Sequence, residues 1–111
     1  MKMLLVLTTL PDLASAQALA SLLVDERLAA CVNILAPCQS IYRWQGAVER
    51  TDEVPVLIKT SEARYAALEA AIVAQHPYQT PEIIALPVGR GLPAYLAWIG
   101  AETRVGQWTM P

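Results

Sequence analysis

The spacing of apolar residues divides the first part of the chain into a strand and a helix. A nearly continuous Leu/Val run over residues 2–8 is typical of a strand buried on both faces. Pro11 ends this run, and Asp12 stands where a helix could begin. From there apolar positions recur at intervals of three or four residues, at Leu13, Ala16, Ala20 and Leu23. This period predicts a helix over about 12–27.

The middle of the chain predicts a long hairpin. Residues 31–44 are strand-like with an interruption at Pro37, and residues 48–59 run back after a turn signal at Gln45-Gly46. Each strand would be about twice the usual length of ~5–6 residues. A ribbon of this length projects beyond a small domain, and an isolated ribbon is only marginally stable in water. We therefore expect its outer half to pack on another subunit.

A second helix is predicted after the hairpin. Ser61 stands where a side-chain oxygen could accept a backbone N–H bond at the start of this helix. Pro77 stops the helix near His76, because the residue before a proline avoids helical geometry. The positions expected to face the core are Tyr65, Leu68 and Ile72.

The rest of the chain predicts a strand over 81–88, a last helix over 92–103, and a tail over 105–111 without periodicity. The order βαββαβ plus a C-terminal helix predicts an α+β protein with a ferredoxin-like sandwich. We expect one domain over 1–104 and the tail over 105–111. Trp44 on the hairpin and Trp98 on the last helix are expected to be largely buried, and Trp108 less so.

Composition adds an expected subunit interface. Apolar residues make up 55% of the 111 residues and charged residues only 16%, against about 45–50% and about 25% in average soluble domains. A small domain cannot hide that much apolar surface alone. The alternative is that abundant Ala inflates the apolar fraction. The net charge is −2 and the basic residues are scattered, which argues against a nucleic-acid partner. No apolar run reaches the ~18–20 residues of a membrane span.

The N-terminus and the cysteines bear on the compartment. Lys2, the apolar run and Ala14-Ser15-Ala16 resemble a signal peptide, but the competing interpretation as a first strand is preferred, with a cytoplasmic protein as the expectation. Cys31 and Cys38 are spaced neither as a redox motif nor as a zinc site. We expect reduced thiols, although a disulfide between them stays possible. Two cysteines also exclude an iron–sulfur cluster, which needs about four ligands.

Candidate chemistry is concentrated in a few residues, each with a structural alternative. His76 is the only imidazole and is expected to be partly exposed, either as a capping or surface residue or as a metal ligand. Cys31 is either a small buried hydrophobe or a thiol that faces a cleft. Lys59 follows an apolar run and needs a partner, for which Glu82 is the candidate. This pair is either a structural ion pair or part of a ligand cleft with an aromatic wall of Tyr42, Trp44 and Tyr78. Catalytic and phosphate-binding motifs are missing, so no enzyme is predicted.

Four short blocks occur in a fixed order, and together they carry a resemblance to a known family. They are RLAACVNI at 27–34, YRWQG at 42–46, LIKT at 57–60 and HPYQTPE at 76–82. In this order and spacing they resemble the CutA family, the divalent-cation tolerance proteins, over nearly the whole chain from about 3 to 104.

The resemblance implies a homotrimer in which the positions matching Tyr42, Trp44, Lys59, Tyr78 and Glu82 gather in the cleft between neighbouring subunits. It also implies copper binding at His76. Copper-tolerance members of the family use a Cys near the end of the first strand and a second His directly before this one. Thr8 and Gln75 stand at those places here. Because copper and zinc favour several N or S ligands, we expect Cu(II) or another divalent cation to bind only weakly.

Three functional hypotheses follow. The first is a cytoplasmic homotrimer that binds a metal or small ligand and takes part in divalent-metal tolerance. The second is a small-molecule sensor similar to the trimeric PII-type signalling proteins, without a physiological metal role. The third is an enzyme that acts in the cleft, for which no residue gives a positive reason.

Overall fold

The computed structural model describes residues 2–104. The prediction for Trp108 and the tail therefore lies outside the described residues. The elements follow the order β1 (Met3–Leu10), α1 (Leu13–Asp25), β2 (Cys31–Ile34), β3 (Cys38–Trp44), β4 (Ala47–Ser61), a short 3-10 turn (Glu62–Arg64), α2 (Tyr65–Gln75), β5 (Ile83–Pro87) and α3 (Pro93–Glu102). No helix in this part of the chain is long and apolar enough to cross a membrane.

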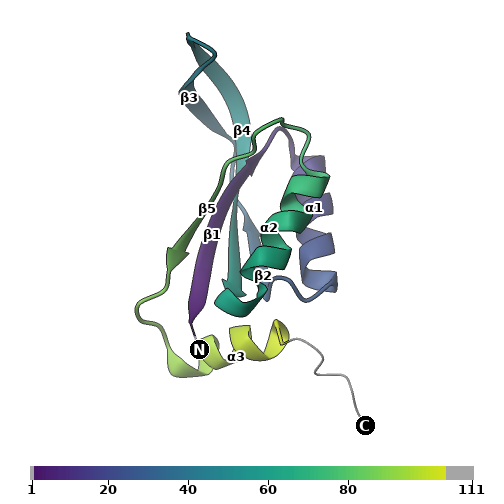
Figure 1. Ribbon diagram of the computed structural model, residues 1–111, viewed down its shortest axis with the longest axis vertical. Coiled ribbons are helices and arrows are strands. Elements are labelled where there is room, and N and C mark those ends of the chain that lie inside the picture. Colours follow the sequence, from purple (N-terminus) through teal and green to yellow (C-terminus); the bar gives the residue numbers. More distant parts are fainter. Residues whose placement is uncertain (1, 105–111) are drawn as a thin grey trace.

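The strands form an antiparallel sheet in the order β2-β4-β1-β5, and β3 pairs with the outer part of β4. Helices α1 and α2 cover one face of this sheet (Figure 1). The predicted α+β, ferredoxin-like sandwich is confirmed. The segment that resembles a signal peptide forms β1, which lies between β4 and β5 near the centre of the sheet.

The two faces of the sheet differ in their cover. Alternate residues of β1 and β4, such as Val6 and Ile58, point to the helices and are fully buried. The other face, called here the open face, carries half-buried leucines and the exposed side chains of Ile84 and Leu86. This face is largely apolar, and within residues 2–104 only α3 covers part of it, at the end where β1 begins.

Local signals explain where the helices begin and end. The side chain of Asp12 accepts the backbone N–H of Ser15 at 2.8 Å and so caps α1, as its position predicts. Helix α2 ends at Gln75, and His76 adopts an extended backbone before Pro77. The capping role expected for Ser61 is wrong, because its side chain caps no helix and instead receives a hydrogen bond from Thr103 of α3.

The predicted long hairpin is present and projects from the sheet (Figure 1). Strand β4 runs for 15 residues, first beside β3 and then between β1 and β2. The turn at its tip uses Gln45 and Gly46, both with positive φ angles of 51° and 84°. Positive φ at both central residues matches the right-handed twist of a two-residue hairpin turn. Trp44 is 40% exposed in the single chain, so the predicted burial is wrong for this chain alone.

Candidate functional site

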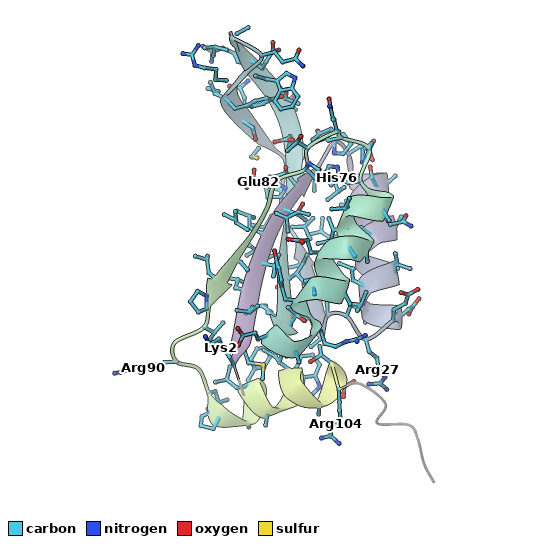
Figure 2. All side chains as sticks on the ribbon, in the orientation of Figure 1. Lys2, Arg27, His76, Glu82, Arg90 and Arg104 are labelled. Carbon is cyan, nitrogen blue, oxygen red and sulfur yellow. The ribbon has the colours of Figure 1, made fainter. Side chains whose placement is uncertain are left out.

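The seven candidate residues do not gather in one place within a chain. His76, Tyr78 and Glu82 lie on the segment between α2 and β5, at the end of the sheet from which the hairpin emerges. Figure 2 shows His76 and Glu82 there, and Lys2 at the opposite end. Tyr42 and Trp44 lie on the hairpin itself, while Cys31 and Lys59 are paired across β2 and β4. A single chain therefore places them on three different parts of the structure.

His76 is buried, with 8% of its surface exposed, and not partly exposed as expected. Its Nε2 lies 2.6 Å from the carbonyl oxygen of Thr9, and its Nδ1 accepts the backbone N–H of Tyr78 at 3.2 Å. A carbonyl can only accept, so Nε2 is the nitrogen that donates, and Nδ1 is the acceptor. Both nitrogens are thus in use, and a metal ion would have to displace one of these hydrogen bonds.

A buried carboxylate beside His76 escaped the sequence analysis. Glu53 of β4 is only 6% exposed, and its carboxylate accepts the hydroxyl of Thr9 at 3.3 Å and the phenol of Tyr78. Within residues 2–104 neither Lys nor Arg forms an ion pair with it. The sequence indication of its burial was that Glu53 is a charged residue directly before the apolar half of a long strand. We call Thr9, Glu53, His76 and Tyr78 the hairpin-base cluster.

Tyr78 connects Glu53 and His76 within this cluster. Its ring lies 4.7 Å from the His76 ring, tilted by 55°. Burial, followed by the hydrogen bond and negative charge of Glu53, raises the pKa of Tyr78 to about 12, with smaller contributions from Tyr42 and Asp12. Burial, the largest cause, and the nearby negative charge both disfavour ionisation of the phenol.

Thr8 and Gln75, which stand at the two places where the resemblance puts further copper ligands, belong to no metal site within residues 2–104 of one chain. The Thr8 hydroxyl is fully buried without a hydrogen-bond partner, and Gln75 is exposed at the end of α2. Among the residues that the structure describes, no three His, Cys, Asp or Glu side chains lie close enough to hold one metal ion.

The predicted pairing of Lys59 with Glu82 does not form within one chain. Strand β1 separates β4 from β5, and Lys59 is level with Leu86, whereas Glu82 lies beyond the far end of β5. Two strand spacings of about 4.8 Å and several residues of about 3.3 Å each lie between them. Glu82 is exposed.

Lys59 has other neighbours, on the open face where α3 crosses the sheet. Its ammonium group donates to Oδ1 of Asn33 at 2.6 Å and lies 6.0 Å from the ring centre of Tyr95. The Tyr95 and Trp98 rings are 5.6 Å apart with a tilt of 31°. Both remain exposed, so the predicted burial of Trp98 is wrong for the single chain. We call Asn33, Lys59, Tyr95 and Trp98 the lysine patch.

The thiols and the hairpin aromatics lie near these two groups without forming a site of their own. Cys31 and Cys38 are both free, which agrees with the expectation of reduced thiols. The Cys31 thiol is half-buried beside Asn33, at 3.9 Å from its Oδ1. Tyr42 uses its hydroxyl within the hairpin, 3.0 Å from that of Thr51.

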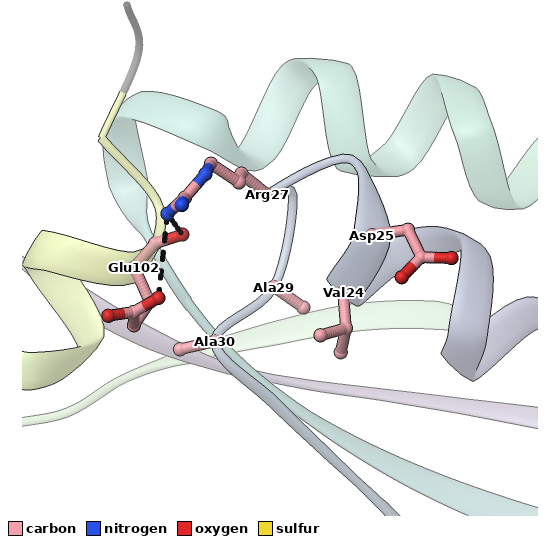
Figure 3. Close-up of a pocket in the computed structure, with 6 residues that line it drawn as sticks. All are labelled: Val24, Asp25, Arg27, Ala29, Ala30 and Glu102. Atoms are coloured by element: carbon pink, nitrogen blue, oxygen red, sulfur yellow. Dashed lines mark hydrogen bonds and ion pairs between the residues drawn. The ribbon is translucent and has the colours of Figure 1, made fainter. Parts of the chain in front are cut away.

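A polar pocket of about 220 Å³ lies elsewhere, between the ends of α1 and α3. Its lining residues are Val24, Asp25, Arg27, Ala29, Ala30 and Glu102, as Figure 3 shows. The Arg27 guanidinium spans it and contacts both the side chain and the backbone carbonyl of Glu102 at 3.4 Å. None of the candidate residues lines this pocket, and its ion pair occupies Arg27 and Glu102.

Comparison with known proteins gives one consistent family. The model of the CutA1 divalent ion tolerance proteins matches residues 4–102. The divalent-cation tolerance protein CutA of Pectobacterium atrosepticum is 46% identical over 99 residues, covering 89% of this chain and 90% of that protein. The protein of the same name from Thermus thermophilus is 46% identical over 98 residues, covering 88% and 95%.

Solved structures give the same result. The crystal structure of CutA from Xylella fastidiosa is 47% identical, with a TM-score of 0.89 over 92% of this chain and 98% of that one. The Thermus thermophilus structure has a TM-score of 0.90 at 44% identity, covering 92% and 99%. The Archaeoglobus fulgidus structure, described as a periplasmic divalent cation tolerance protein CutA, has a TM-score of 0.89 at 35% identity, covering 92% and 99%.

Proposed function

The chain belongs to the CutA1 divalent ion tolerance family, and on that premise we propose that it is a cytoplasmic homotrimer that binds divalent cations, Cu(II) among them, between its subunits. The proposal includes no catalytic activity. A cytoplasmic location is supported by β1, because signal-peptide cleavage near Ala16 would remove a strand from the middle of the sheet. The Archaeoglobus fulgidus relative differs here, since its description calls it periplasmic.

The observation that carries the proposal is the buried Glu53 carboxylate in the hairpin-base cluster. Its partners are the neutral Thr9 hydroxyl and Tyr78 phenol, and no basic side chain within residues 2–104 pairs with it. A buried charge is costly unless a counter-charge or a metal ion accompanies it. A divalent cation would supply that charge, with His76 beside it as the one imidazole in the chain.

A location between subunits follows from what one chain lacks. Three potential ligands do not come together among the described residues of a single chain. A second chain must therefore supply ligands, such as Glu82 or a residue of the projecting hairpin. Since Thr8 and Gln75 stand where softer or stronger ligands would bind copper, we expect weak binding.

The homotrimer is supported by the surface of the single chain. The open face of the sheet exposes Ile84 and Leu86, and the hairpin exposes Ile41, Trp44 and Val48. Contiguous exposed apolar surface of this kind marks an interface. A second copy that covers it would also stabilise the projecting ribbon.

Calorimetric titration with Cu(II) and Zn(II) tests the metal proposal. We expect the wild type to bind with a dissociation constant well above the nanomolar range. Glu53→Gln and His76→Ala should each weaken binding by at least about tenfold, which corresponds to ~1.4 kcal/mol.

Glu62→Gln is the matched control, because it removes an equal charge from an exposed position near Lys2, at the opposite end of the molecule. It should leave the titration unchanged. Equal binding by all four proteins would remove the hairpin-base cluster from the metal site. Nanomolar binding by the wild type would contradict the incomplete ligand set.

A second candidate function, a small-molecule sensor similar to the PII-type proteins, is favoured by one specific observation. The lysine patch places a positive charge, which no carboxylate within residues 2–104 pairs with, beside two exposed aromatic rings. Such a surface suits an organic ligand and not a metal cation.

A further inference from the structure

Cys38 lies at the point where the hairpin leaves the sheet. Strand β4 pairs with β1 from Val54 onward and with β3 up to Glu53, which is directly opposite Cys38. Side chains at directly opposite positions of two antiparallel strands point to the same face, with Cβ atoms about 4.5–5.5 Å apart. The Cys38 side chain therefore lies on the same face as the Glu53 carboxylate, next to the hairpin-base cluster.

The hairpin face that carries Cys38 lies against this cluster. Tyr42 is on the same face, four positions further along β3. After burial and Glu53, Tyr42 also contributes to the raised pKa of Tyr78, which places the two phenols near each other. The Cys38 thiol makes one polar contact within residues 2–104, with the Ser40 hydroxyl at 3.9 Å. This long contact to a neutral group leaves the sulfur able to bind another partner.

Glu53 supplies the second half of a ligand pair at this place. Its side chain is 6% exposed, and no basic side chain within residues 2–104 neutralises its charge. Thiolates and carboxylates both bind zinc, with Zn–S distances of about 2.3 Å and Zn–O distances of about 2.0–2.2 Å. A cysteine and a glutamate on opposite strand positions are close enough to hold one ion at these distances.

We propose that Cys38 supplies a thiolate ligand to a divalent cation beside Glu53, so that the site prefers thiophilic ions such as Zn(II) and Cd(II) over hard ions such as Mn(II). This proposal rests on the proposed function and adds a ligand to it. On binding, the S–H bond of Cys38 breaks, a metal–sulfur bond forms, and the proton passes to water.

The rest of the ligand set lies at the subunit contact. Within residues 2–104 of one chain, Cys38, Glu53 and His76 do not converge on a single point. A second copy therefore completes the set, as the proposed function already requires. The proposal needs no free surface at Cys38, because the ion is held between subunits.

Titration of the reduced full chain with Cd(II) tests for the thiolate, because a thiolate bound to Cd(II) gives a charge-transfer absorption band in the ultraviolet. The chain has two cysteines, so Cys31→Ser is the matched control and leaves Cys38 as the one thiol. We expect the band in the wild type and in Cys31→Ser, and its loss in Cys38→Ser. Since a band in Cys31→Ser is assigned by that variant alone, the test does not depend on the folding of Cys38→Ser.

Affinities and the carboxylate variant add the rest of the test. Cys38→Ser should weaken Zn(II) binding by at least about tenfold, while Cys31→Ser should bind Zn(II) like the wild type. Glu53→Gln should weaken Zn(II) binding and also remove the Cd(II) band. Titration with Mn(II), which prefers oxygen ligands, should show no difference between the wild type and Cys38→Ser.

The outcomes separate this proposal from the proposed function. Zn(II) binding that is weakened in Glu53→Gln, with no Cd(II) band in Cys31→Ser, would overturn the role of Cys38 and leave the proposed function standing. A band that persists in Glu53→Gln would come from a thiol without its carboxylate partner and would overturn the proposal as well. If Zn(II) binds equally to the wild type and Glu53→Gln, the proposed function fails and this proposal fails with it.

Discussion

At the scale of single residues, the contact between the end of α2 and the sheet depends on His76. One small ring links Thr9 of β1 with Tyr78 of the following segment, through a nitrogen on each side. This use of both nitrogens explains why a residue that the sequence marks as a surface or metal-binding group is buried. It also makes the ring part of the folded structure, whatever it binds.

We predict that His76→Ala lowers the free energy of unfolding by about 1–3 kcal/mol, because it leaves a buried carbonyl and a backbone N–H without their partner. Urea denaturation at one fixed protein concentration measures this. Gln75→Ala, at the exposed neighbouring position, should change the value by less than ~0.5 kcal/mol. Equal effects of both changes would show that the His76 hydrogen bonds contribute little.

Tyr78 gives a prediction about pH. The pKa of its phenol is raised from 10.0 in the unfolded reference to about 12 in the fold, so the fold favours the neutral form. Its contribution to stability is fully present below pH 10 and is lost as the pH rises from 10 to about 12. Tyr78→Phe should reduce the loss of stability in this window, measured by denaturation at a series of pH values. An unchanged profile would contradict the assignment.

Two residues show where the sequence analysis reached its limit. The sequence indicated that the charge of Lys59 needs a partner. Which residue can be that partner depends on the strand order, because β1 lies between β4 and β5. Glu53 was missed because its burial comes from Thr9 and Tyr78, which lie far from it in the chain. Such contacts between distant segments leave no local pattern.

At the scale of elements, local signals were sufficient. Pro11, Asp12 and Pro77 set the ends of β1, α1 and α2 where steric and capping rules predict them. Alternation and length predicted the hairpin and its turn. The exception is Ser61, whose hydroxyl was used by α3, an element about forty residues further along. A capping residue in the sequence predicts a helix cap correctly only when no tertiary contact uses the same side chain.

The hairpin turn gives the prediction at this scale. Gly46→Ala should destabilise the protein by roughly 1–2 kcal/mol, because a side chain at φ 84° is strained even though no atom lies within 4 Å of the new methyl group. Gly89→Ala is the matched control, since that position is equally open and has no positive φ, and it should be nearly neutral. Thermal unfolding of both variants measures the difference. Equal melting temperatures would contradict the turn geometry.

At the scale of the whole molecule, the apolar excess of the sequence appears as surface that one chain cannot cover. We predict that Ile84→Glu on the open face dissociates the proposed trimer, because it would place a charge in the interface. Val73→Glu on α2 is the control, since Val73 is 53% exposed and Ile84 51%, but it lies on the helical side of the molecule. Light scattering during gel filtration measures both. A wild type that is a stable monomer would contradict the assembly itself.

Strand β4 belongs to both the hairpin and the sheet, and so couples them mechanically. Its first residues lie in the projecting ribbon, and its last residues lie between β1 and β2, on one continuous backbone without an intervening loop. We therefore expect a force on the hairpin tip to act along β4. It would strain the hydrogen bonds of β4 to β1 and to β2 at the same time. Glu53 and Lys59 both lie on β4, so we expect a displacement of the hairpin to shift the two residues together.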